Sequence, residues 1–71
     1  MQFKLDKLKG KIKEEGFSQK EIAKYLNIAP STFSLKINGI VFFGADEIEK
    51  IAKLLKIPGE QYKDYFFTLK V

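Results

Sequence analysis

Apolar residues recur every three or four positions along most of this chain, and they predict a series of short helices. Leu5, Leu8 and Ile12 form one such stripe, and Gly16 then suits the left-handed conformation that ends many helices. Glycine, proline and asparagine interrupt the pattern at intervals. The interruptions leave five segments that favour helix, at about residues 3–15, 18–27, 30–38, 45–56 and 59–66.

The second segment has the clearest helix start. Ser18 stands three residues before Glu21, the spacing of a capping box, in which each side chain binds the backbone amide of the other residue. Phe17 and Ile22 occupy the positions of a hydrophobic staple across that start. Asn27 follows the last apolar position and tolerates a positive φ, so the helix should end there.

The second and third segments have the spacing of a helix-turn-helix unit. Two helices that cross closely need a small residue at the crossing, and Ala23 supplies it. Asn27 suits the turn, Pro30 is favoured in a first helical turn, and Phe33 can anchor the second helix against the first. In such units the second helix is the one that enters the major groove of DNA.

Two apolar stretches are open to more than one interpretation. In the run Val41-Phe42-Phe43, either one or two side chains cover the core or the run contacts a second subunit. The final residues, 67–71, alternate apolar and polar side chains, so they form either a short strand or a frayed end.

The amino-acid composition narrows the range of possible functions. The 71 residues suffice for one domain, 1–71, with a net charge of +4 and an isoelectric point near 9.4, which favours a polyanionic partner. Cysteine and histidine are absent, so we expect no metal, no cofactor and no enzyme activity. No apolar run is long enough to span a bilayer and the first residues do not form a secretion signal, so we expect a cytoplasmic protein.

The stretch from Ser18 to Ser34 resembles the DNA-binding unit of the Cro/CI family of phage repressors. The resemblance continues through Asn38-Gly39 and the stretch 48–55, and it covers roughly residues 5–66. The aromatic-rich ending from Tyr65 also resembles small phage-encoded regulators of Gram-positive hosts. The family implies an all-α fold, a compact bundle of about five short helices of the lambda repressor type. It also implies binding to double-stranded operator DNA, usually as a homodimer.

Carried over position by position, the resemblance places base-reading residues on the third segment. Ser31 and Leu35 fall at base-reading positions, and Gln19 falls where the family commonly touches a phosphate. Pro30 could offer only an apolar contact, such as one with a thymine methyl group. The full set of expected DNA-binding residues is Gln19, Pro30, Ser31, Thr32, Ser34, Leu35, Lys36 and Asn38.

These features lead to a first hypothesis, a transcriptional repressor that reads the major groove with its third helix. All 13 basic residues are lysine, so the bidentate arginine contact to guanine is missing, and A·T-rich sites would be preferred. The alternative is a protein-interaction module, antitoxin-like or an anti-repressor, that kept the fold without the DNA contact. Pro30, Leu35 and the run 41–43 motivate this alternative.

Overall fold

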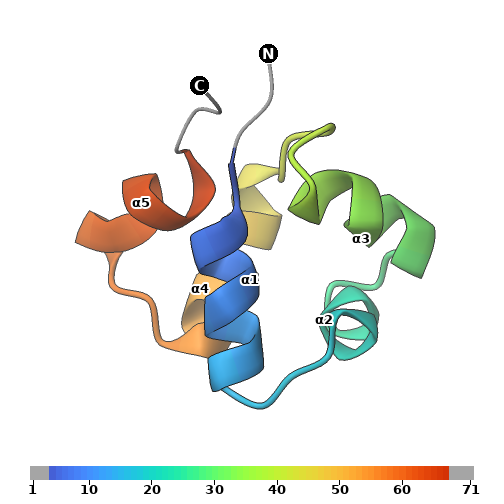
Figure 1. Ribbon diagram of the computed structural model, residues 1–71, viewed down its shortest axis with the longest axis horizontal. Helices are drawn as coiled ribbons and strands as arrows, with labels where there is room; N and C mark the ends of the chain where they lie inside the picture. Colours follow the sequence, from blue (N-terminus) through green and yellow to red (C-terminus); the bar gives the residue numbers. More distant parts are fainter. Residues whose placement is uncertain (1–3, 68–71) are drawn as a thin grey trace.

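Short helices surround a single apolar core, with α1 running through the centre of the view in Figure 1. The computed structural model describes residues 4–67, and the statements below concern those residues. Within them the predicted all-α fold is confirmed, because they form five α-helices and no strand. The elements are α1 (Asp6–Glu14), α2 (Gln19–Tyr25), α3 (Pro30–Ile37), α4 (Ala45–Leu55), a 3-10 turn, η1 (Gly59–Gln61), and α5 (Tyr62–Phe66).

The first and last helices differ most from their predicted boundaries. The first helix begins at Asp6 rather than near residue 3, because Leu5 takes a non-helical backbone conformation while its side chain is buried. The last predicted helix is split, since residues 59–61 form the tighter η1 turn before α5. Of the predicted tail, Phe67 ends α5 without joining a strand, and residues 68–71 lie outside the described part.

The predicted capping box at the start of α2 is confirmed. The Glu21 amide donates to Ser18 Oγ at 3.1 Å, and the Ser18 amide donates to Glu21 Oε1 at 2.8 Å. Because the ionised carboxylate accepts the Ser18 amide, the pKa of Glu21 lies below its usual value. Phe17 packs against the core, and Ile22, the other position of the predicted staple, is fully buried.

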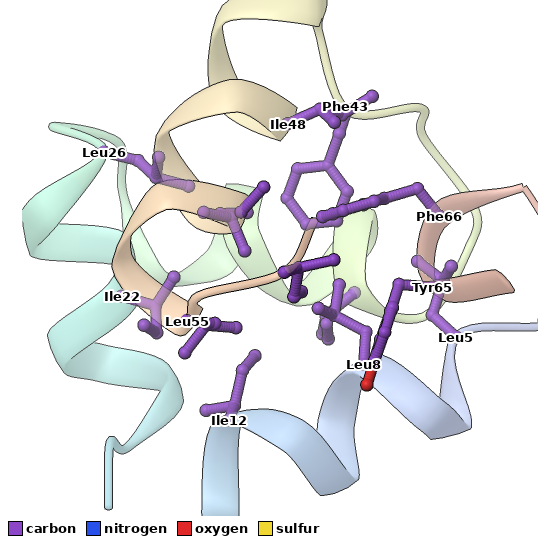
Figure 2. Close-up of a cluster of buried hydrophobic side chains, with 14 of the residues drawn as sticks. Leu5, Leu8, Ile12, Ile22, Leu26, Phe43, Ile48, Leu55, Tyr65 and Phe66 are labelled. Carbon is purple, nitrogen blue, oxygen red and sulfur yellow. The ribbon is translucent and has the colours of Figure 1, made fainter. Parts of the chain in front are cut away.

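The core draws its side chains from every α-helix. In the close-up of Figure 2, Ile12 of α1, Ile22 of α2 and Leu55 of α4 converge. Phe43, from the loop after α3, points into the same core, with its ring centroid 6.0 Å from that of Phe66. This burial is the main driving force for folding a chain this short. None of the helices in the described part is long and apolar enough to cross a membrane.

Helices α2 and α3 are in contact, and Ala23 lies on the buried side of α2. Its side chain is almost completely buried, and its carbonyl accepts the amide of Ile28 at 3.0 Å. Asn27 adopts the expected left-handed conformation, with φ of 59°, and so reverses the chain between the two helices. Phe33 of α3 is buried on the facing side. The burial of Ala23 and Phe33 and the backbone conformation of Asn27 are as predicted, and the helix-turn-helix unit itself stays a prediction.

Replacing Ala23 with leucine should force α2 and α3 apart, because no space remains at the crossing. We expect a loss of about 1–3 kcal/mol in the free energy of unfolding, the usual range for overpacking. Thermal or urea unfolding followed by circular dichroism measures it. Lys20→Leu is the control, since Lys20 is an exposed residue of the same helix. Equal stability of the two variants would contradict the tight crossing.

Candidate interaction surface on α3 and the loop that follows it

Helix α3 has a buried flank and an outer flank. Phe33 and Ile37 are buried against the rest of the molecule. Ser31, Ser34 and Leu35 are exposed on the other side. Leu35 keeps 45% of its surface exposed, so it belongs to the outer flank and not to the core.

The two predicted site residues at the end of α3 are engaged within the molecule. Lys36 Nζ donates to Glu47 Oε1 on α4, and both side chains are largely buried, at 15% and 17% exposed. Asn38 is exposed, but its side chain accepts a hydrogen bond from Lys9 Nζ at 2.9 Å. The nitrogen of its side-chain amide, Nδ2, donates to the backbone carbonyl of Ser34 at 2.8 Å. Neither group projects freely from the outer flank.

The other residues predicted to bind DNA lie in the first turns of α2 and α3. Gln19 and Pro30 are exposed, while Thr32 is half-buried. Lys20 and Lys24 lie one turn apart on α2, and they line a shallow groove that ends at Pro30. The structure therefore gathers the hydroxyl and apolar members of the predicted set on α3, and the two lysines on the α2 side form no ion pair with any of residues 4–67. Among residues 4–67, no cluster of three or more acidic side chains is placed to hold a metal ion.

The loop between α3 and α4 carries exposed apolar side chains, and its backbone is bonded to that of the exposed Leu35. Ile40, Val41 and Phe42 have 56%, 43% and 62% of their surface exposed. The amides of Ile40 and Val41 both donate to the carbonyl of Leu35, at 3.0 and 3.3 Å, which holds the loop against the end of α3. We call Leu35, Ile40, Val41 and Phe42 the apolar patch. Figure 1 shows the yellow-green loop projecting beyond the end of α3.

In the run Val41-Phe42-Phe43, one side chain covers the core, as the first interpretation expected, while contact with a second subunit stays a prediction. Phe43 is buried, with its ring 5.8 Å from Phe33 and 6.0 Å from Phe66 between centroids, so it anchors the loop in the core. Val41 and Phe42 remain on the surface. Apolar side chains presented on an anchored backbone lose little conformational freedom when they bind, which favours their use as an interface.

Sequence reasoning missed two residues of this region. Ile40 follows the Asn38-Gly39 break, and nothing in the pattern distinguished it from an ordinary loop residue. The second is Glu47, in the first turn of α4. Its position three residues after Gly44 is a capping signal, and its Oε1 does accept the Gly44 amide at 2.8 Å.

The Glu47 carboxylate is held in its charged form. Burial alone would raise its pKa, but the hydrogen bonds from Lys36 and from the Gly44 amide outweigh that effect. The positive charges of Lys36 and Lys50 act in the same direction, so the pKa of Glu47 lies below its usual value. The ion pair with Lys36 therefore persists at neutral pH.

Comparison with known proteins assigns the chain to a protein family. A family model described as "Protein of unknown function (DUF739)" matches residues 1–69. The chain belongs to this family. No curated protein matches this DUF739 protein.

A solved structure extends the comparison. The protein is similar to the solution structure of the modulator of repression (MOR) of the temperate bacteriophage TP901-1 from Lactococcus lactis. The two sequences are 34% identical, the match covers 100% of this chain and 96% of that one, and the TM-score is 0.77. The resemblance to phage regulators is thereby supported at the level of a phage regulatory protein, whereas the Cro/CI assignment stays a prediction.

The pKa of Glu47 predicts a pH dependence of stability. Its folded-state pKa lies below the unfolded value of 4.5, so its contribution is fully present above pH 4.5 and is lost as the pH falls through the folded pKa. Wild-type protein should therefore exceed Glu47→Gln in stability at neutral pH, by on the order of 1 kcal/mol. The difference should shrink in acid. Urea unfolding at a series of pH values tests this, and a difference that grew in acid would refute it.

Proposed function

We propose that this protein regulates phage repression by binding a repressor protein through the apolar patch. The role is one of non-catalytic protein–protein interaction. The observation that carries the proposal is the cluster of Leu35, Ile40, Val41 and Phe42, exposed together and fixed to the end of α3.

Surface chemistry supports a protein partner for this region. Contiguous exposed apolar side chains on a small protein commonly mark an interaction site, and aromatic residues are frequent anchors in interfaces. Among the large apolar side chains of residues 4–67, Phe42 is the most exposed, at 62%. Phe43 beside it is buried, so a core contact holds the backbone that presents Phe42.

The similarity to MOR supports the choice of a repressor as the partner. That protein is named as a modulator of the repression of its phage, and the resemblance covers the whole of this chain. A modulator of repression acts on a repression system, and direct contact with the repressor is the simplest way for a protein to do so.

The electrostatics of α3 favour this role over direct reading of DNA. DNA-binding surfaces obtain most of their affinity from cations that contact phosphates. Lys36 is the only basic residue of α3, and Glu47 binds its ammonium group. The outer flank of α3 therefore presents hydroxyl and apolar groups without a free positive charge.

A second candidate function is binding to double-stranded operator DNA, for which α2 gives specific support. Lys20 and Lys24 project from α2 beside Pro30, and Gln19 and Ser31 are exposed near them. This arrangement would bring two cations to the phosphates while α3 faces the groove, as a helix-turn-helix repressor does, whether as a homodimer or singly. Leu35 would take part in both functions, whereas Lys20 and Lys24 would serve only the second and Phe42 only the first, so substitutions at these three residues can separate the functions.

Phe42→Ser should weaken binding to the repressor of phage TP901-1 at least tenfold, because an aromatic anchor at an interface typically contributes about 2 kcal/mol or more. Isothermal titration calorimetry measures the affinity, and thermal unfolding confirms that the fold is intact. Tyr25→Ser is the matched control. Tyr25 is also an exposed aromatic residue, but it lies on α2 outside the apolar patch.

Two outcomes would overturn the proposal. One is wild-type protein that does not bind the repressor, and the other is equal loss of binding in Phe42→Ser and Tyr25→Ser. A parallel titration with duplex DNA tests the second candidate. Salt-sensitive DNA binding that is lost in Lys20→Ala and Lys24→Ala but kept in Phe42→Ser would favour the DNA-binding function instead.

A further inference from the structure

The loop that carries most of the apolar patch is held at both ends. At its start, the Leu35 carbonyl accepts two loop amides, and Gly39 takes a positive φ of 78° that allows the turn. At its end, the Gly44 amide donates to Glu47 Oε1 at 2.8 Å. Between these ends, Phe43 is the only loop residue from 40 to 43 that is buried.

A single carboxylate oxygen, Glu47 Oε1, connects the two ends of the loop between α3 and α4. The Glu47 Oε1 atom that accepts the Gly44 amide also accepts the ammonium group of Lys36. Lys36 lies next to Leu35 near the end of α3, and Glu47 lies in the first turn of α4. The Lys36–Glu47 pair therefore bridges the two helices between which the loop runs, so it constrains the path of the loop.

The same contact removes a charge from the surface beside Leu35. Binding of a protein partner over a free lysine would cost free energy, because water would have to be removed from the ammonium group. Glu47 already compensates this charge within the molecule, and both side chains are more than four-fifths buried. Without Glu47, the positive charge of Lys36 would lie unpaired beside Leu35, where it would favour a phosphate group over an apolar partner.

We propose that Glu47 is a positioning residue that sets the specificity of the apolar patch, because its carboxylate fixes the 38–44 loop and withdraws the charge of Lys36 from α3. The docking part of this inference rests on the proposed function. Glu47 acts through Lys36 and through the Gly44 amide, without touching the partner.

Glu47→Gln is the decisive variant. Glutamine can still accept the Gly44 amide, as it does in capping boxes, but it cannot neutralise Lys36. Glu49→Gln is the matched control, since it makes the same change of charge on an exposed residue of the same helix that has no ion pair in the described part. Lys36→Met removes the charge together with the ion pair while keeping an unbranched, apolar side chain.

Three measurements give distinct expectations. Amide hydrogen exchange at Ile40 and Val41 should be faster in Glu47→Gln and Lys36→Met than in Glu49→Gln. Affinity for the TP901-1 repressor should fall roughly five- to tenfold more in Glu47→Gln than in Glu49→Gln. With a random-sequence DNA duplex, the dependence of log affinity on log salt should be steeper by about 0.9 in Glu47→Gln than in Glu49→Gln, as for one added phosphate contact. Lys36→Met should lack that gain.

The outcomes separate the two proposals. Equal amide exchange and equal salt dependence in Glu47→Gln and Glu49→Gln would overturn the positioning role, whatever the repressor does. If wild-type protein did not bind the repressor, the proposed function would fail, while exchange and salt dependence would still decide the role of Glu47 in fixing the loop and neutralising Lys36.

Discussion

The close approach of α2 and α3 is the constraint on which the rest of the structure depends. It requires a residue with almost no side chain at the crossing, Ala23, and a left-handed turn at Asn27. Together with the burial of Phe33, these two conditions set the direction in which α3 leaves the pair. The outer flank of α3 and the loop that follows it are exposed because the opposite flank is committed to this packing.

The apolar patch follows from how the chain leaves α3. The Leu35 carbonyl accepts hydrogen bonds from the amides of Ile40 and Val41, and Phe43 lies in the core beside Phe66. The loop between these fixed points is short, so its apolar side chains cannot all be buried, and Phe42 remains outside. The stability of the core and the exposure of the patch thus arise from the same contacts, which is why a small domain can present a rigid apolar surface.

Local rules predicted the helices well but did not predict how the loop organises the surface. The helix start at Ser18 and the turn at Asn27 depend on neighbours within a few residues, so spacing and residue type were enough to find them. The pairing of Lys36 with Glu47 joins residues from different helices, and it depends on the path of the chain between them. Position-by-position inference therefore placed Lys36 on the DNA-facing surface, whereas the fold turns its charge toward α4. No local pattern could reveal that Ile40 would extend the surface of Leu35.

We propose that this phage regulatory protein meets its partner at the loop between α3 and α4 rather than at the start of the α2–α3 unit. The most direct measurement is a nuclear magnetic resonance titration of isotope-labelled protein with unlabelled TP901-1 repressor and, separately, with duplex DNA. We expect the repressor to shift or broaden the backbone signals of Leu35 and of residues 40–42 first. Changes confined to Gln19, Lys20 and Ser31, produced by DNA and not by the repressor, would contradict the account.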